Sequence, residues 1–156
     1  MLTETLPTIK KELQHKSSEE LLELCLRLSK FKKENKELMS YLLFMEADIP
    51  EYIIEVKKQI NKDFAQINNN NYYLIKKSVR KILRYAKKQI RFTLKKEVAV
   101  EVLIHFCLKM KTIRPSISNN KMLSNIYDRQ IAAIQKDIST LHEDLQYDYQ
   151  QKLDAL

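Results

Sequence analysis

The feature that most constrains the fold is the complete absence of glycine from the 156 residues. At an average usage of about 7%, a chain of this length would carry roughly eleven. Glycine supplies the left-handed backbone of tight hairpin turns and the close backbone approach of phosphate-binding loops. The P-loop, the GxGxxG dinucleotide fingerprint and the nucleophile elbow are therefore excluded in their usual forms. An all-β or doubly wound fold is also disfavoured, and we expect an all-α protein.

The length and the composition predict a single domain over residues 1–156. With 44% hydrophobic and 31% charged residues, the chain is typical neither of disordered nor of membrane-embedded proteins. No apolar run approaches the roughly 18 residues of a membrane span, and the first residues lack a signal-peptide pattern. We expect a cytoplasmic protein that makes no membrane contact.

Helical periodicity predicts about seven helices joined by short polar connectors. Ser17 and Glu20 have the spacing of a capping box, and Asp48 with Pro50 is a helix-start signal. The final helix would be long for a small domain, and its last turns could project from the rest. The expected ranges are about 3–15, 17–31, 36–47, 50–67, 72–96, 97–113 and 121–156.

The predicted sixth helix is apolar around nearly its whole circumference, which indicates a central position in the fold. It contains Cys107, and the predicted second helix contains Cys25. Neither cysteine belongs to a CxxC motif or to a Cys/His cluster, so we expect two buried, reduced thiols and no disulfide or zinc site.

One internal similarity is found. Leu21–Leu28 aligns without gaps on Leu103–Met110, with cysteine on cysteine and base on base. It predicts duplicated helical hairpins near 17–47 and 97–140, separated by about twice the period of HEAT and armadillo repeats. We therefore expect antiparallel helix pairs stacked as an α-solenoid, a HEAT- or armadillo-like superhelix, in preference to a compact bundle.

The charge is concentrated in residues 72–96. The whole chain has a net charge of +8, from 28 Lys and Arg against 20 Asp and Glu, but no acid lies between residues 64 and 96. At about 100° per residue, the bases of this predicted helix fill one face and the apolar residues the other. The predicted basic face consists of Lys76, Lys77, Arg80, Lys81, Arg84, Lys87, Lys88, Arg91 and Lys95.

This basic face is the predicted contact surface of a non-enzymatic binding or scaffolding module. A protein partner is the first expectation. Phosphate contact with nucleic acid is the alternative, because Tyr73, Tyr85 and Phe92 flank the face and aromatic rings can stack on unpaired bases. A merely solvated face, or one neutralised by the acidic C-terminal helix, is a further interpretation. That C-terminal helix is also a candidate contact for homo-oligomers.

The nearest approach to a catalytic pattern is Glu97, Glu101 and His105, spaced four apart on the predicted sixth helix. Ferritin-like carboxylate sites use a Glu-x-x-His spacing and further glutamates from other helices, which this chain lacks. We interpret the three residues as an exposed polar stripe with ordinary pairing along the helix. The sequence thus predicts no enzyme activity, no metal and no cofactor.

Overall fold

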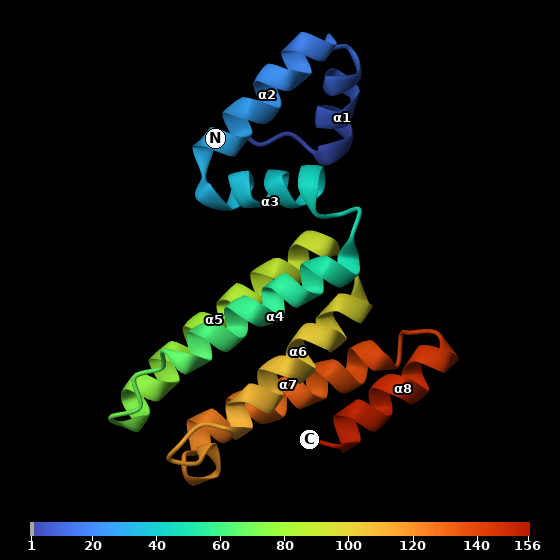
Figure 1. Cartoon of the computed structure of the whole chain (residues 1–156). Helices are drawn as coiled ribbons and strands as arrows, with labels where there is room; N and C mark the ends of the chain where they lie inside the picture. Colours follow the sequence, from blue (N-terminus) through green and yellow to red (C-terminus); the bar gives the residue numbers. More distant parts are fainter. Residues whose placement is uncertain (1) are drawn as a thin grey trace. The chain divides into compact units, whose positions relative to one another are not determined.

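The computed structural model describes residues 2–156, and its regular structure there is entirely helical, which confirms the all-α class. It has eight α-helices where about seven were expected (Figure 1). The helices are α1 (Leu6–Gln14), α2 (Ser18–Phe31), α3 (Lys33–Phe44), α4 (Ile49–Ala65), α5 (Tyr72–Thr93), α6 (Lys96–Lys111), α7 (Lys121–Ile138) and α8 (Glu143–Asp154), with a 3₁₀ turn at Ile117–Asn119.

Several helices start where the sequence supplies a cap. The Ser17 hydroxyl accepts a hydrogen bond from the Glu20 amide, and the Glu20 carboxylate accepts one from the Ser17 amide, which confirms the predicted capping box. Asp48 caps α4, and Asn71 caps α5 by accepting a bond of 2.9 Å from the Leu74 amide. These side chains satisfy amides that have no partner within their own helix.

The chain divides into two compact units, Met1–Phe44 and Met45–Leu156. We call them unit 1 and unit 2. The single domain predicted over residues 1–156 stays a prediction, because the division concerns packing and not independent folding.

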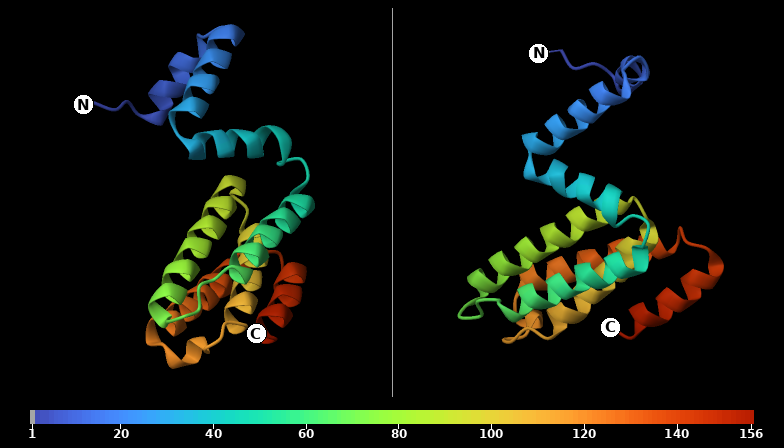
Figure 2. Two further views of the ribbon diagram at one scale, coloured as in Figure 1. Left: turned by 60° about the vertical axis from the view of Figure 1, so that its left-hand side comes forward. Right: turned by 45° about the horizontal axis from the view of Figure 1, so that its top comes forward.

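Unit 1 contains α1, α2 and α3. Helix α1 lies alongside α2, and α2 contacts α3 (Figures 1 and 2). Within residues 2–44, Tyr41 is the only buried residue. The leucines of these amphipathic helices therefore remain largely accessible, and this unit lacks a core of its own.

Unit 2 is built around α6, which contacts α4, α5, α7 and α8. Helices α4 and α5 form an antiparallel hairpin that is clear in every ribbon view (Figure 2). The predicted central position of the sixth helix is confirmed, because all its apolar side chains except that of Leu108 are buried. The buried residues of α6 are Val98, Ala99, Val100, Val102, Leu103, Ile104, Phe106, Cys107 and Met110.

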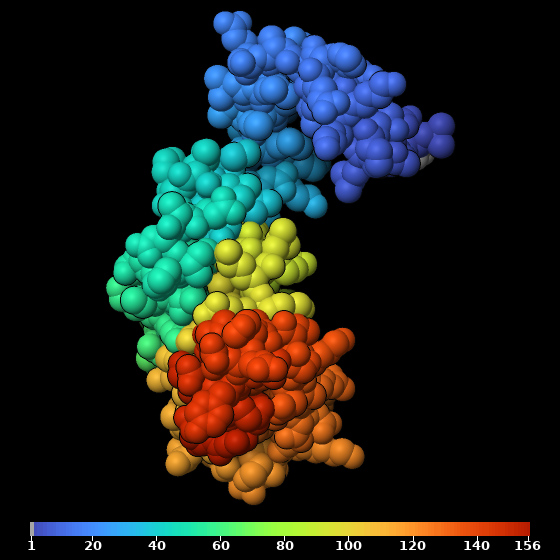
Figure 3. Space-filling view, turned by 90° about the vertical axis from the view of Figure 1, so that its right-hand side faces the viewer, coloured from blue at the N-terminus to red at the C-terminus, as the bar shows by residue number. Residues whose placement is uncertain are grey.

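The expectation of one long C-terminal helix is wrong. Helix α7 stops at Ile138, and α8 starts at Glu143 after a turn. The Ser139 and Thr140 hydroxyls donate to the carbonyls of Lys136 and Asp137, and such local bonds compete with continuing the helix. Tyr149 and Leu153 of α8 are buried, so the final turns pack on unit 2 instead of projecting (Figure 3).

The two cysteines have different environments. Cys107 is buried, as predicted, but Cys25 is exposed, which corrects the expectation for the second thiol. The reason is that α6 contacts α4, α5, α7 and α8, whereas α2 contacts mainly α3. The predicted duplication stays a prediction, although 17–47 and 97–140 each include a helix, a connector and a second helix.

Candidate functional site

Helix α5 separates its two faces as the sequence predicts. Ile75, Val79, Ile82 and Ala86 are buried in unit 2, and they recur every three or four residues. Burial of this row fixes the rotation of the helix, because turning it would expose apolar surface. The opposite, basic side must then face away from the core.

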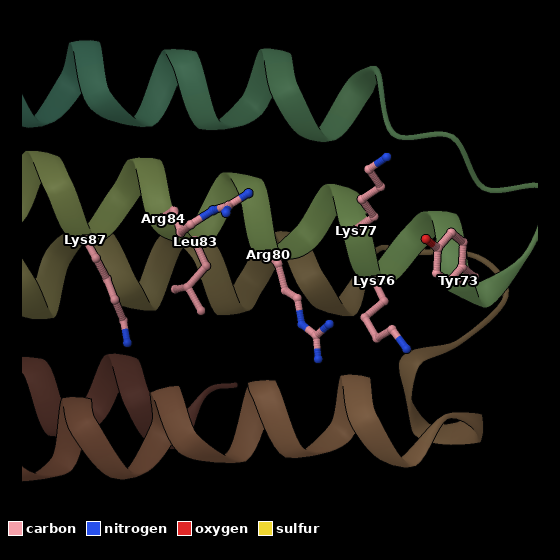
Figure 4. Close-up of a pocket in the computed structure, with 7 residues that line it drawn as sticks. All are labelled: Tyr73, Lys76, Lys77, Arg80, Leu83, Arg84 and Lys87. Carbon is pink, nitrogen blue, oxygen red and sulfur yellow. The ribbon is translucent and has the colours of Figure 1, made fainter. Parts of the chain in front are cut away.

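Part of the basic side lines a groove of about 510 Å³ on the flank of α5 (Figure 4). In this view Lys76, Arg80, Leu83 and Lys87 point to one side of α5, whereas Lys77 points to the other. The ammonium of Lys76 lies 3.3 Å from the sulfur of Met122 on α7, so α7 borders the groove at this end. The residues that line the groove are Tyr73, Lys76, Lys77, Arg80, Leu83, Arg84 and Lys87.

The groove carries an uncompensated positive charge. Five of its seven lining residues are Lys or Arg, and none is an acid. Within residues 2–156, none of these five cations forms a salt bridge. Closely spaced cations repel one another, so an anion bound among them would be stabilised by several charges at once.

Tyr73 gives one end of the groove an aromatic surface. Its side chain is 66% exposed. The Lys76 ammonium lies 6.0 Å from the centre of the Tyr73 ring, a weak cation–π contact that holds the two side chains together. The remaining ring surface is free to contact a ligand.

The structure divides the predicted basic face into two groups. Lys76, Lys77, Arg80, Arg84 and Lys87 line the groove, whereas Lys81, Lys88, Arg91 and Lys95 lie outside it. Of the flanking aromatics, Tyr73 belongs to the groove, and Tyr85 and Phe92 are half-buried elsewhere on α5. Sequence reasoning missed Leu83 as a lining residue and Met122 as a neighbour of Lys76, because both are seen only in the folded structure.

The polar stripe on α6 is exposed at Glu97, as expected, but Glu101 and His105 are half-buried, and the stripe pairs with other helices instead of along α6. The Glu101 carboxylate accepts a hydrogen bond from Lys57 of α4 at 2.7 Å. It also accepts one from the Tyr149 hydroxyl at 3.0 Å and lies 3.3 Å from the Lys152 ammonium, both on α8. Glu97 lies 3.1 Å from the same Tyr149 hydroxyl. The stripe thus links α6 to the two helices on either side of it.

These surroundings shift the acidities of the cluster. Burial raises the pKa of Glu101, but Lys57, Tyr149 and Lys152 together outweigh that effect and lower the pKa below its usual value. Burial, followed by the positive charges of Lys57 and Lys109, lowers the pKa of His105. The His105 ring nitrogen Nε2 lies 2.7 Å from the Asn61 side-chain oxygen. Glu101 and His105 are therefore held by structural partners.

Two further observations concern other kinds of site. In the part of the chain that the structure describes, no group of three or more His, Cys, Asp or Glu residues is placed to hold a metal ion. Among the described helices, none combines the length and the apolar character needed to cross a bilayer.

The chain matches no protein-family model, no curated protein and no solved structure. The assignment of a function therefore depends on the geometry of the chain itself.

Proposed function

We propose that this protein is a non-enzymatic binding module that holds an anionic partner on the basic face of α5. The observation that carries the proposal is the groove on α5, in which five cations gather with no acid among them and with no salt bridge within the described residues. Such a site attracts anions over a distance of about a Debye length, and its occupant would relieve the repulsion among the cations.

The first candidate partner is a protein that presents an acidic segment. The groove mixes cations with the apolar surfaces of Tyr73 and Leu83. A peptide with both carboxylates and hydrophobic side chains would complement both kinds of surface. In this reading the protein works as a scaffold, acts without catalysis and resides in the cytoplasm.

Nucleic acid is the second candidate, and the arrangement along α5 favours it specifically. Lys76, Arg80, Arg84 and Lys87 are three or four residues apart, so they follow the helix axis over about 16 Å at 1.5 Å per residue. Tyr73, at one end, could stack on an unpaired base. A single strand whose phosphates follow the row would pair one phosphate after another with a cation.

The proposed scaffold for this surface is a solenoid-like stack. Helix α6 contacts α4 and α8, which are not adjacent to it in sequence. Successive helices also contact one another from α4 to α8. Contacts of this pattern support antiparallel pairs stacked as in helical-repeat proteins, with α5 on the outside of the stack.

Binding to labelled single-stranded DNA and to labelled polyglutamate, each at low and at moderate salt, tests the proposal. The groove variant carries Arg80→Glu, Arg84→Glu and Lys87→Glu. The control variant carries Lys81→Glu, Arg91→Glu and Lys95→Glu, which changes the net charge equally but lies outside the groove. We expect the groove variant to lose at least about 100-fold in affinity and the control variant to lose much less.

The two polyanions separate the two candidates. Preferential binding of DNA, with log affinity falling against log salt with a slope of about −3 for four or five phosphate contacts, would support nucleic acid. Preferential binding of polyglutamate would support an acidic protein. Equal losses in the groove and control variants, or no binding at low salt, would show that the face is only solvated.

A further inference from the structure

Unit 1 exposes an unusual amount of apolar surface for its size. Of the 21 large hydrophobic side chains that are exposed within residues 2–156, 14 belong to unit 1. Only Tyr41 is buried between residues 2 and 44. Exposed apolar surface on this scale marks an interaction site. The apolar surface of unit 1 therefore needs a partner.

One accessible row on α2 is what we call the α2 seam; Leu28 and Phe31, which are also exposed, lie outside it. At about 100° per residue, its members project within an arc of about 100°. Leu22 and Leu26 are 60% and 50% exposed, more than Leu21 and Leu24 on the side nearer to their neighbours. The α2 seam consists of Ser18, Leu22, Cys25, Leu26 and Ser29. Two leucines among small residues allow another helix to approach closely.

We propose that the α2 seam binds the α2 seam of a second copy of this chain, with the two helices antiparallel about a two-fold axis near Cys25. Unit 1 carries eight Lys and Arg against seven Glu, a net charge of +1, so two copies do not repel each other strongly. A nearly neutral surface also gives a strongly charged partner no advantage.

The charges beside the seam are complementary to themselves in this arrangement. Glu19 and Lys30 project along the same edge of the seam, from opposite ends of α2. In an antiparallel pair, like edges face each other, so Glu19 of each copy faces Lys30 of the other. Within the described residues, neither side chain forms a salt bridge, so both are available. The antiparallel helix dipoles add a further attraction.

Burial of the seam would not leave the Ser29 hydroxyl without a hydrogen-bond partner. The Ser29 hydroxyl donates to the carbonyl of Cys25 at 2.8 Å and needs no other partner. The capping-box residues Ser17 and Glu20 bond to each other and anchor the start of α2. The helix therefore presents the seam in a defined conformation before association.

Sedimentation or light scattering of the full-length chain over a range of concentrations tests the pairing. We expect the mass to rise from one chain toward two. Leu22→Lys should weaken the dimer at least about 100-fold, because it places two charges in the apolar contact. The matched control is Leu43→Lys in α3, where the leucine is 65% exposed. It should leave the association unchanged.

A charge exchange distinguishes self-pairing from a general effect on α2. Glu19→Lys alone and Lys30→Glu alone should each weaken the dimer about ten-fold, because each replaces two attractive pairs by two repulsive ones. The double variant should restore the association, although both changes oppose the helix dipole.

Disulfide cross-linking through Cys25 tests the proposed two-fold axis of the dimer. Mild oxidation of the full-length chain should give a disulfide-linked dimer that Cys25→Ser abolishes. Replacement of the buried Cys107 by alanine should leave the amount of disulfide-linked dimer unchanged. A monomer at all concentrations would overturn the proposal and mean that the seam is covered within one chain. Dissociation by Leu43→Lys as strong as by Leu22→Lys, or no rescue in the double exchange, would overturn it as well.

Discussion

At the scale of single residues, the absence of glycine leaves a strained backbone conformation at the junction of α5 and α6. The chain turns there through Leu94, with φ of 55° and ψ of 20°, the left-handed conformation that glycine normally provides at a helix end. The Leu94 side chain is 91% exposed and packs on almost nothing. The Thr93 hydroxyl accepts a hydrogen bond of 3.2 Å from the Lys95 amide and helps to hold the turn. Leucine at this position therefore contributes strain without packing.

Replacement of Leu94 by glycine should stabilise the protein. Removal of the Cβ relieves roughly 1–2 kcal/mol of left-handed strain, part of which is offset by the greater freedom of glycine in the unfolded chain. We expect a net gain of about 1 kcal/mol and a melting temperature higher by about 2–4 °C. Thermal unfolding of the variant and of the original protein measures this gain. Leu94→Ala keeps the Cβ and should give no comparable gain; an equal gain would show that the strain is not at this carbon.

At the scale of elements, burial separates two helices with similar sequences. The segments Leu21–Leu28 and Leu103–Met110 align residue for residue, yet the first lies in an exposed helix and the second in the centre of unit 2. Burial raises the pKa of Cys107 to about 12, so its thiol stays protonated and unreactive. The aligned residues therefore do not decide this difference; the remaining residues of each helix and its packing neighbours do.

Substitution of each aligned cysteine by aspartate, one at a time, should distinguish the buried helix from the exposed one by the loss of stability. Cys107→Asp places an unpaired carboxyl group in the core and should destabilise the fold by about 4 kcal/mol or more, with loss of the cooperative melt. Cys25→Asp should leave the unfolding of unit 2 nearly unchanged, because Cys25 is exposed. Thermal melts followed by circular dichroism compare the stabilities of the two variants. A normal melt for Cys107→Asp would mean that α6 is not central.

At the scale of the whole molecule, the Glu101 cluster joins three helices of unit 2. Lys57 comes from α4, Glu101 from α6, and Tyr149 with Lys152 from α8. Because the cluster spans helices that are distant in sequence, its protonation affects the packing of the unit as a whole. The neighbouring His105, which is linked to Asn61 of α4, titrates in the same region of the fold.

The stability of the protein should fall as the pH is lowered. The pKa values of His105 and Glu101 are both below their ordinary values of 6.5 and 4.5, so the unfolded chain binds protons more readily than the folded one. The contribution of His105 is complete above about pH 6.5 and is lost as the pH falls through its folded pKa; that of Glu101 is lost at lower pH.

Thermal melts between pH 8 and pH 4 check this dependence. We expect a decline that begins near pH 6.5 and steepens below pH 4.5. His105→Gln should remove the decline that begins near pH 6.5, and Glu101→Gln should remove the decline below pH 4.5. Both variants should have a lower melting temperature than the original protein. A melting temperature that rises on acidification through this range would contradict both assignments.

The sequence alone determined the helical class, the rotation of α5 and the central place of α6. Each depends on local information: the absence of glycine, the spacing of Ile75, Val79 and Ile82, and an apolar circumference. The caps at Ser17, Asp48 and Asn71 are local as well, because each bonds to an amide three residues away.

The tertiary structure alone decided which bases line the groove, where the C-terminal helix breaks and which cysteine is buried. The sequence placed nine bases on one face, but only the folded structure shows that five of them line a groove, which α7 borders at Lys76. Likewise, Glu101 meets Lys57 and Tyr149 because α4 and α8 pack on both sides of α6. Contacts between segments distant in the chain depend on the final packing, and local periodicity carries no information about it.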